Sequence, residues 1–407
     1  MEILLVSGLC STNKYKWITE VRTVPSLDPA QRMFLAIVEG LHENGCNVTC
    51  ISALPMGTSN TNAENRYFPR SEECENGVKF IYPAFHIGKF RRLRDLYKHT
   101  IVEVKQWLEE TTGKKRFILC DSLLAACTQG TRRLAQKKSV KVFAYVTDYP
   151  SLATSIKKKN TSLFRKLLQG LYDKFADHDL TKYDGYILVA EALKDLIGIK
   201  NKPYLVIEDV IAVPNEEIKI ENEKSASFTI VYGGALCERF GVNKLADAVH
   251  KISNDNVALH FYGSGESVAY IDDLNKKDAR ICYCGQVSFD ELQKIQRSAS
   301  LLVNPRPSNE SFAAYSFPSK TLSYMLSGTP VLTTRIPGIP NSYQPYLLWF
   351  DNEDTNSMAK KIEEIVSTPN ENLRELGKKA FAYAKTEKNS RAQTSKLISF
   401  AEREIYE

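Results

Sequence analysis

The feature that most constrains the fold is an alternation of short apolar runs with amphipathic stretches. Residues 3–7 form an apolar run that ends in small residues, as a buried strand does. Residues 30–44 carry apolar side chains at helical spacing and end at Gly45, and the same alternation continues to residue 207. Strands that alternate with helices form a parallel sheet through right-handed crossovers. The pattern therefore predicts an α/β fold.

A polar, acidic stretch at residues 214–227 interrupts this alternation and has the composition of a linker. The alternation restarts at residues 229–232, and a chain of 407 residues has the length of two domains. We predict two doubly wound, Rossmann-like domains, residues 1–222 and 223–387, that face each other across a cleft. Residues 388–407 are predicted to form a helix that packs back on the first domain. In such sheets ligands bind at the carboxyl ends of the strands.

The nine cysteines do not form a disulfide pattern, because their number is odd and no CxxC pair occurs. Cys46, Cys50, Cys120 and Cys282 lie in apolar runs, so we predict buried thiols and a reducing cytoplasm. The N-terminus lacks a basic segment followed by a cleavage site, and no run approaches 18 apolar residues. These observations predict a cytoplasmic protein.

Several common catalytic motifs are absent from the sequence. The first strand is not followed by GxGxxG, and GxxxxGK[ST], HExxH and GxSxG do not occur. The candidate carboxylate pair, Asp272 and Asp273, lies in a polar, helical run and is interpreted as part of a solvated helix face. We therefore predict no metal site.

Small-residue turns follow successive predicted strands in the second half of the chain. They lie at residues 233–235, 263–266, 285–287 and 305–307, and a longer loop at residues 315–320 leads into a predicted helix at residues 321–326. Glycine lets backbone amides approach a ligand closely, and a helix N-terminus favours phosphate. Ser319 stands at the expected N-cap, and Lys320 adds a positive charge beside it. Together these turns predict an anion site without a metal.

The order and spacing of these stretches resemble a known family. The stretches are VYGGALCERFG from Val231, FYGSGE from Phe261, GQVS from Gly285, LVNPRP from Leu302, SFPSK from Ser316 and YMLSGTPV from Tyr324. Residues 228–345 are similar to the donor domain of a family-4-type retaining glycosyltransferase of GT-B (two-Rossmann) architecture, of the bacterial surface-polysaccharide type. The N-terminal half resembles the same group more loosely, through residues 25–31, Asp148 and residues 206–208.

The resemblance implies a nucleotide-sugar donor, with UDP or GDP as the nucleotide and no other cofactor. It implies that Arg239 and Lys320 stabilise the leaving diphosphate and that the sugar configuration is retained without a covalent intermediate. The donor-binding residues that it implies are Gly233, Gly234, Gly263, Ser264, Gly265, Glu266, Gln286, Val287, Glu310, Tyr315, Ser316, Phe317, Pro318, Ser319 and Ser323. Asp148 follows a predicted strand and is either a catalytic residue, as a partner or base for the acceptor hydroxyl, or a turn-forming or helix-capping residue.

The chain departs from the family pattern at three positions. Tyr315 and Ser323 stand where many members carry two glutamates, and Ala235 replaces an arginine of the first glycine loop. These departures leave a catalytically degraded partner subunit as an alternative to a glycosyltransferase. A nucleotide-sugar 2-epimerase is a further alternative, although few of the six histidines fall at predicted strand ends.

The net charge of +6 arises wholly in residues 1–222, and residues 79–174 carry 21 basic against 7 acidic side chains, a net of +14. Such runs are either a solvated face or a surface for an anionic partner. The resemblance implies a glycan or a polyprenyl-diphosphate-linked saccharide as acceptor, so we predict peripheral attachment to the anionic inner face of a membrane. No nucleic-acid-binding module is found, and no nucleic-acid partner is predicted.

Overall fold

The computed structural model describes residues 1–21, 29–56, 67–155, 163–213 and 227–406. The predicted linker at residues 214–227 lies almost wholly outside this part of the chain, as do portions of residues 25–31 and 157–166. The chain divides into two compact units. Unit 1 comprises Met1–Ala212 together with Ser390–Glu407, and unit 2 comprises Val213–Asn389.

Unit 1 is built on an eight-stranded sheet of order β10-β9-β8-β7-β1-β2-β5-β4. Its strands are β1 (Glu2–Ser7), β2 (Asn47–Ser52), β4 (Ser71–Glu75), β5 (Val78–Tyr82), β7 (Arg116–Asp121), β8 (Val142–Val146), β9 (Gly185–Leu188) and β10 (Tyr204–Val206). All neighbouring pairs are parallel except β4 and β5, which form a hairpin across Asn76 and Gly77, both with positive φ. β4 is not predictable from the sequence pattern, because its residues SEECE lack an apolar alternation.

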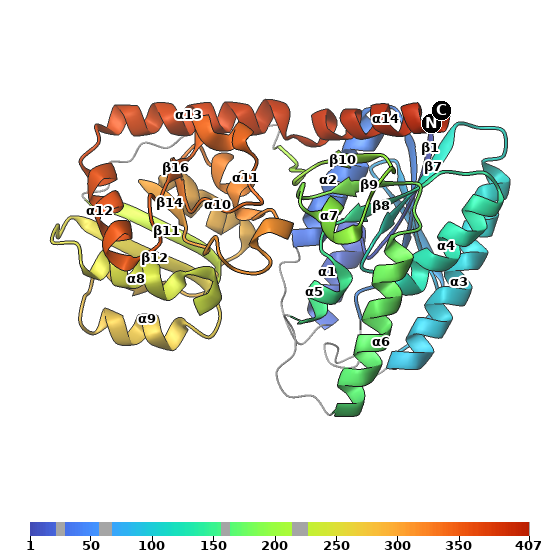
Figure 1. Ribbon diagram of the computed structural model, residues 1–407, viewed down its shortest axis with the longest axis horizontal. Helices are drawn as coiled ribbons and strands as arrows, with labels where there is room; N and C mark the ends of the chain where they lie inside the picture. Colours follow the sequence, from blue (N-terminus) through green and yellow to red (C-terminus); the bar gives the residue numbers. More distant parts are fainter. Residues whose placement is uncertain (22–28, 57–66, 156–162, 214–226, 407) are drawn as a thin grey trace. The chain divides into compact units, whose positions relative to one another are not determined.

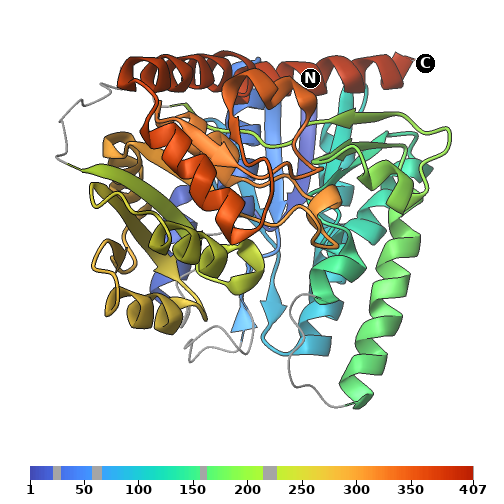
Figure 2. The same ribbon diagram turned by 60° about the vertical axis from the view of Figure 1, so that its left-hand side comes forward.

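Helices cover both faces of this sheet (Figures 1 and 2). They are α1 (Thr12–Val21), α2 (Pro29–Glu43), α3 (Lys89–Glu110), α4 (Ala125–Lys137), α5 (Pro150–Ser155), α6 (Leu163–Leu180), α7 (Leu193–Ile197) and α14 (Ser390–Tyr406), and a separate pair of short strands is formed by β3 (Tyr67–Phe68) and β6 (Phe85–His86). The C-terminal helix α14 packs against α2. Gly40 permits this contact, because a Cβ there would lie 2.4 Å from the Ser390 carbonyl oxygen.

Unit 2 is a parallel six-stranded sheet of order β13-β12-β11-β14-β15-β16 with helices around it (Figure 1). Its strands are β11 (Phe228–Ala235), β12 (Val257–Ser264), β13 (Ile281–Tyr283), β14 (Leu301–Asn304), β15 (Val331–Thr333) and β16 (Leu348–Trp349). Its helices are α8 (Val242–His250), α9 (Val268–Asn275), α10 (Phe289–Ser298), α11 (Lys320–Met325), α12 (Thr355–Val366) and α13 (Asn370–Glu387), with 3₁₀ turns η1 (Glu238–Phe240), η2 (Ala313–Tyr315) and η3 (Asn341–Tyr346). The predicted fold class, two doubly wound α/β units, is confirmed.

The central strand β11 anchors the core of unit 2. Ile230 and Tyr232 are fully buried and pack with side chains from β12, α8 and α12. Full burial of such a side chain contributes about 1.5–3 kcal/mol to the free energy of unfolding. The packed core therefore fixes the position at which β11 ends. The loops that follow β11, β12, β13 and β14 therefore start from one rigid edge of the sheet.

Most of the cysteines predicted to be buried are buried, and the Asp272–Asp273 pair is exposed. Cys46, Cys50 and Cys120 are buried free thiols, as predicted, whereas Cys282 is only half-buried because it lies on the edge strand β13. Asp272 and Asp273 are exposed on α9, which agrees with a solvated helix face. In the described residues, no helix combines the length and the apolar character that crossing a membrane requires.

Candidate functional site

The loop after β11 is shaped by glycine. Gly234 has a φ of +139°, and a Cβ at this position would lie 2.3 Å from the Cε atom of Lys320. Gly241, with a φ of +77°, begins α8, and a Cβ there would lie 2.0 Å from the Pro305 carbonyl oxygen. Both positions thus require glycine, because the chain passes close to Lys320 at one and to the loop after β14 at the other. The β11 loop, the β14 loop and Lys320 are brought together as a result.

The neighbouring glycine loops lie against this one. A Cβ at Gly263 would lie 1.9 Å from the Gly234 carbonyl oxygen, and one at Gly265 would lie 2.1 Å from the Leu236 carbonyl oxygen. The Gly263 amide also donates to the Gly285 carbonyl oxygen at 2.9 Å. The structure therefore joins three of the predicted turns at one edge of the sheet. Four predicted nucleotide-pocket residues are exposed there or nearby: Ser264, Gly265, Glu266 and Gln286, with Val287 half-buried beside them.

Lys320 is held by Tyr232, the buried tyrosine of β11. Its Nζ atom donates to the Tyr232 hydroxyl at 2.5 Å and lies 3.9 Å from the centre of the Tyr232 ring. The same hydroxyl donates to the Ala235 carbonyl oxygen at 2.8 Å. Burial and, secondarily, the charge of Arg306 lower the pKa of Lys320 to about 7. The ammonium group is therefore fixed beside the glycine loop but incompletely charged at neutral pH.

Arg306 follows β14 and is a second cation at this site. Its residue is only 7% exposed, and its guanidinium carbon lies 4.3 Å from the centre of the Phe312 ring. The Arg306 carbonyl accepts a hydrogen bond from the Thr334 hydroxyl, which ties the loop to the end of β15. Prolines on both sides of Arg306 restrict the backbone further. Burying a cation in this way lowers the stability of the fold unless an anion or a dipole interacts with it.

Arg239 lies against the same aromatic ring. Its guanidinium carbon is 5.6 Å from the centre of the Phe312 ring and 4.8 Å from that of Phe240. Neither Arg239 nor Lys320 forms an ion pair with an acidic side chain in the described part of the chain. The cation cluster, which we define as Arg239, Arg306 and Lys320, thus gathers three positive side chains around Phe240, Phe312 and Tyr232. Like charges at this spacing repel one another and favour an anion between them.

The start of α11 differs from the sequence prediction. Ser319 does occupy the N-cap position, but it has helical backbone angles and its side chain accepts no capping hydrogen bond. The helix spans six residues from Lys320, and the Thr321 amide already donates to the Pro318 carbonyl oxygen at 2.8 Å. A helix of fewer than two turns has only a small macrodipole. The positive potential at this position therefore comes from the side-chain cations rather than from a helix terminus.

Ser323 and Tyr324 have roles within the protein itself. The Ser323 hydroxyl donates to the Lys320 carbonyl oxygen at 3.0 Å, inside its own helix. The buried Tyr324 hydroxyl accepts from the Gly233 amide at 2.9 Å and donates to the Gly233 carbonyl at 3.2 Å. The Gly233 amide, expected to face the donor diphosphate, is thus bound to Tyr324. Tyr324 therefore holds the glycine loop in place through these two hydrogen bonds.

Replacement of Tyr324 by phenylalanine should lower the stability of the protein and weaken donor binding. The buried Gly233 amide and carbonyl would lose their partner, which costs about 1–3 kcal/mol for each group left unsatisfied. Urea denaturation of the full chain measures the first effect. The control is Tyr346→Phe, since the Tyr346 hydroxyl makes no hydrogen bond to a described residue and its ring stacks on Tyr383. Equal midpoints for the two variants would show that the Tyr324 hydroxyl does not support the loop.

The remaining predicted residues belong to the loop between β14 and α11. Gly338 supports this loop, because a Cβ there would lie 2.4 Å from the Ser316 carbonyl oxygen. Phe317 is buried and its ring packs on Tyr343, so the side chain anchors the loop in the core. The other members are half-buried or exposed, apart from the buried Pro318: Glu310, Tyr315, Ser316 and Ser319. The Ser308 amide is bound by both oxygens of Glu353, at 3.1 Å each, which holds the opposite end of the loop.

Asp148 belongs to unit 1 and lies two residues after the end of β8. It is half-buried, and α5 begins two residues later at Pro150. The neighbouring Tyr149 has its pKa raised by burial and by Asp177. The structure therefore places Asp148 at the carboxyl end of a central strand, where ligands of such sheets bind. In the described residues, no group of three or more His, Cys, Asp and Glu side chains could hold a metal ion.

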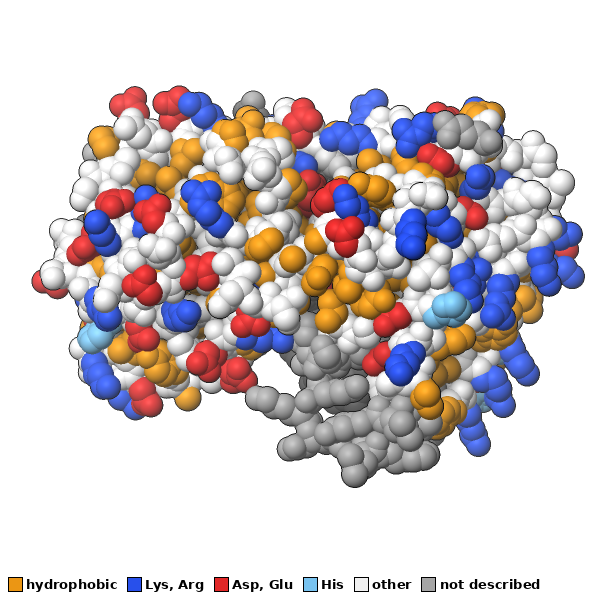
Figure 3. Space-filling model, viewed as in Figure 1, with side chains coloured by type: hydrophobic (Ala, Val, Ile, Leu, Met, Phe, Trp, Pro, Cys, Tyr) orange, Lys and Arg blue, Asp and Glu red, His pale blue; other side chains and the backbone are white. Residues whose placement is uncertain are grey.

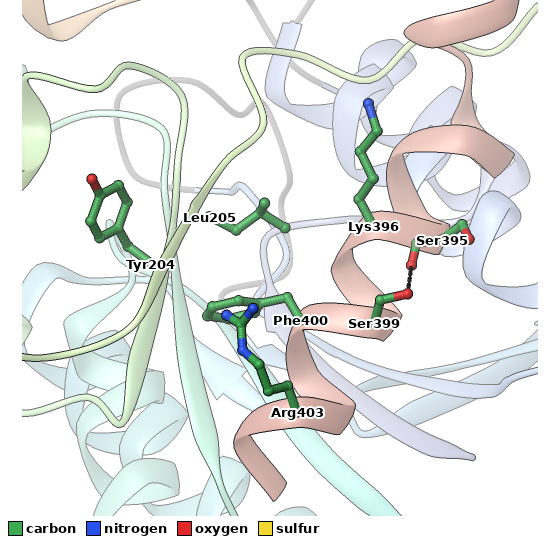
Figure 4. Close-up of a pocket in the computed structure, with 7 residues that line it drawn as sticks. All are labelled: Tyr204, Leu205, Ser395, Lys396, Ser399, Phe400 and Arg403. Atoms are coloured by element: carbon green, nitrogen blue, oxygen red, sulfur yellow. Dashed lines mark hydrogen bonds between the residues drawn. The ribbon is translucent and has the colours of Figure 1, made fainter. Parts of the chain in front are cut away.

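Unit 1 also has a pocket of about 420 Å³ between β10 and α14 (Figure 4). It is lined by Tyr204, Leu205, Ser395, Lys396, Ser399, Phe400 and Arg403. Arg403 lies along the Phe400 ring, and its Nε atom donates to Glu404 at 3.1 Å. The pocket contains none of the predicted site residues, and its Arg403 is occupied in packing the C-terminal helix.

Comparison with known proteins agrees with this geometry. Residues 227–368 match the family model described as "Glycosyl transferases group 1", which covers the glycine loops and the cation cluster. No curated protein sequence matches the chain. This part of unit 2 is therefore a glycosyltransferase group 1 domain, and the protein is a glycosyltransferase.

Solved structures share the fold along the whole chain. Sucrose-phosphate synthase from Thermosynechococcus elongatus is 15% identical with a TM-score of 0.66, and 99% of each chain is covered. The catalytic domain of starch synthase IV from Arabidopsis thaliana, bound to ADP and acarbose, is 10% identical with a TM-score of 0.67 and full coverage of both chains. WaaG, a glycosyltransferase involved in lipopolysaccharide biosynthesis, is 12% identical with a TM-score of 0.57, covering 100% of this chain and 98% of that one. These likenesses show the GT-B architecture.

Proposed function

We propose that this glycosyltransferase transfers a sugar, with retention of configuration, from a nucleoside-diphosphate sugar to a glycan or a lipid-linked saccharide in surface-polysaccharide biosynthesis. The observation that carries the proposal is the cation cluster within the glycosyltransferase group 1 domain. Lys320 and Arg239 have no acidic partner among the described residues, and the buried Arg306 lies beside them. A diphosphate is an anion of suitable size and charge for three neighbouring cations.

The chemistry follows from the charge that develops during transfer. The bond between the anomeric carbon and the diphosphate oxygen breaks, and the bond from the acceptor oxygen to the same carbon forms. The leaving diphosphate gains negative charge as it departs, which Lys320, Arg306 and Arg239 would stabilise more strongly in the transition state than in the ground state. In this proposal the side chains supply that charge without a divalent metal, and the acceptor proton passes to Asp148 or to the leaving diphosphate.

Nucleotide binding tests the proposal. The full chain is titrated with UDP, GDP, ADP and CDP, and its melting temperature is followed. A ligand at about 100 times its Kd stabilises the folded state by about 2.7 kcal/mol, so one nucleotide should give a clear upward shift. We expect UDP or GDP to do so. A chain that responds to none of the four would contradict the proposal and favour a catalytically degraded partner subunit, for which the substitutions at Ala235 and Ser323 are the sequence argument.

We further propose that the acceptor is carried on a polyprenyl diphosphate and that the enzyme works as a peripheral protein on the cytoplasmic face of the membrane. The net charge of +14 in residues 79–174 supports an anionic partner for unit 1. The fold shared with WaaG, which acts in lipopolysaccharide biosynthesis, is in keeping with a lipid-linked acceptor.

Substitution of Asp148 by asparagine should reduce sugar transfer by about 100-fold or more, since a positioned general base contributes roughly 100- to 10,000-fold. Donor affinity and melting temperature should stay unchanged, because Asp148 belongs to unit 1 and asparagine has nearly the same shape. The control is Asp195→Asn on the exposed face of α7. If Asp148 only forms a turn, its asparagine variant will melt at a lower temperature and retain its turnover.

A further inference from the structure

Unit 1 exposes large apolar side chains on two helices. Phe90 and Val102 of α3 are 73% and 60% exposed, and Leu171 and Phe175 of α6 are 59% and 44% exposed. Burying such side chains in an apolar medium is worth about 1.5–3 kcal/mol each, so leaving four of them in water forgoes a sizeable stabilisation. Their exposure therefore indicates a surface that meets something apolar.

The cations of α3 lie on the same side as Val102. Arg91, Arg94, Lys98 and Lys105 are exposed and follow one another at intervals of three, four and seven residues, which places them on one face of the helix. Figure 3 shows lysine and arginine side chains along the edge where α3 lies in Figure 1, with hydrophobic side chains beside them. The outer face of α3 is thus both basic and apolar.

The acidic residues of these helices mostly point inward. In α3, Asp95 is buried and paired with His86 and Arg94, and Glu103 is buried and paired with Arg70. In α6, Asp179 is buried and paired with Arg132.

The remaining charges of α6 and of the neighbouring helix α4 also leave this surface positive. Asp173 of α6 is also buried, whereas Lys174 is exposed beside Leu171 and Phe175. The helix between them, α4, packs against both α3 and α6 and contains no acidic residue. Acidic side chains reach the surface of α3 only in its last turn, at Glu109 and Glu110.

We propose that this face of unit 1 is the surface by which the protein binds an anionic phospholipid bilayer. We define this basic–apolar face as Phe90, Arg91, Arg94, Lys98 and Val102 of α3 with Leu171, Lys174 and Phe175 of α6. Its cations match the negative surface potential of the membrane, and its four apolar side chains enter the interface between headgroups and acyl chains.

A mixed surface of this kind fits a lipid interface better than it fits a protein. An acidic protein would pair with the cations but would leave Phe90 and Leu171 without a matching apolar partner, unless it carried a complementary patch. A bilayer supplies both properties over any area. The proposal rests on the lipid-linked acceptor proposed above, since it names the surface through which the enzyme reaches that acceptor.

The test is flotation of the full chain with vesicles of phosphatidylcholine alone and of phosphatidylcholine with about one third phosphatidylglycerol. We expect binding to the anionic vesicles only, and weaker binding at high ionic strength. The triple variant Arg91→Glu, Lys98→Glu, Lys174→Glu should lower the partition coefficient by about 100-fold, because each basic residue near the surface contributes about 1 kcal/mol. The variant Phe90→Ser, Leu171→Ser should lower it by about 100-fold or more, because two apolar side chains no longer enter the interface.

The matched control is Lys277→Glu, Lys360→Glu, Lys378→Glu, which changes the net charge equally through exposed lysines of unit 2. This control should bind like the unaltered protein. The proposal is overturned if either test variant also does so, if neutral vesicles bind equally well, or if the test variants lose only self-association in analytical ultracentrifugation, which would assign the face to a second copy. The assay contains neither donor nor acceptor, so its failure is distinguishable from failure of the proposed enzyme activity.

Discussion

Replacement of Lys320 by methionine is expected to lower kcat by about 100- to 1,000-fold, the range seen when one preorganised electrostatic contact to a developing charge is removed. The melting temperature should stay the same or rise. Lys320 is packed between Tyr232 and Gly234 beside the charge of Arg306, so its ammonium group is destabilised while no anion is bound. Methionine keeps most of the side-chain volume and removes the charge. Initial rates and a thermal melt measure the two effects.

The pH dependence separates a catalytic Lys320 from a structural one. Because burial and Arg306 lower the pKa of Lys320 to about 7, the free enzyme loses this positive charge as the pH rises through that value. Affinity for an intact nucleotide sugar should therefore fall as the pH rises above about 7, and donor binding should be accompanied by proton uptake on Lys320. The Lys320→Met variant should lack this pH dependence.

The control for Lys320 is Lys378→Met, an exposed lysine of the same unit that forms no ion pair with a described residue. We expect it to keep both its turnover and its pH profile. If Lys320→Met melts at a lower temperature and retains kcat, Lys320 is a structural residue and the cation cluster is not the diphosphate site.

The second large effect is expected at Arg306. Replacement by methionine should weaken nucleotide binding by about 10- to 100-fold, because a hydrogen bond to a charged group contributes about 1.5–3 kcal/mol. Methionine preserves the apolar contact with the Phe312 ring, so the loop after β14 should keep its position. Isothermal titration with the nucleotide that stabilises the protein measures the loss.

Arg306 and Lys320 should also be coupled. Since the charge of Arg306 helps to lower the pKa of Lys320, the Arg306→Met variant should shift the pH dependence of donor binding to higher pH. The two substitutions together should cost less than the sum of their separate effects, because both groups act on one anion. Independent, additive effects and an unmoved pH profile would show that the two cations serve different sites.

The sequence predicts much of this architecture because its signals are local. The apolar runs and helical spacings identify the strands and helices of both units, and the glycine turns at residues 233–235 and 263–266 do lie together at one edge of the unit 2 sheet. Lys320, singled out beside Ser319, does lie against the first of these turns. Each of these features depends on residues close together in the chain and on the regular order of a doubly wound sheet.

What the sequence does not predict depends on contacts between distant residues. The burial of Arg306 against Phe312 and its effect on the pKa of Lys320 depend on how the loop after β14 packs, which the sequence does not show. The one local signal for Arg306 is its position between two prolines after a buried strand. The double hydrogen bond from Tyr324 to Gly233 spans 91 residues. The sequence also predicts a capping hydrogen bond from Ser319, which is absent because the Thr321 amide at the start of this six-residue helix bonds to the Pro318 carbonyl oxygen instead.

A crystal structure of the full chain with its preferred nucleoside diphosphate bound would test the central claim most directly. We predict that diphosphate oxygens lie about 2.7–2.9 Å from Lys320 Nζ and from the Arg306 guanidinium, with Arg239 at the edge of the same group. The Lys320 ammonium group would then donate hydrogen bonds to the diphosphate as well as to the Tyr232 hydroxyl. A diphosphate bound elsewhere on the chain, with Lys320 still directed only at Tyr232, would contradict the account.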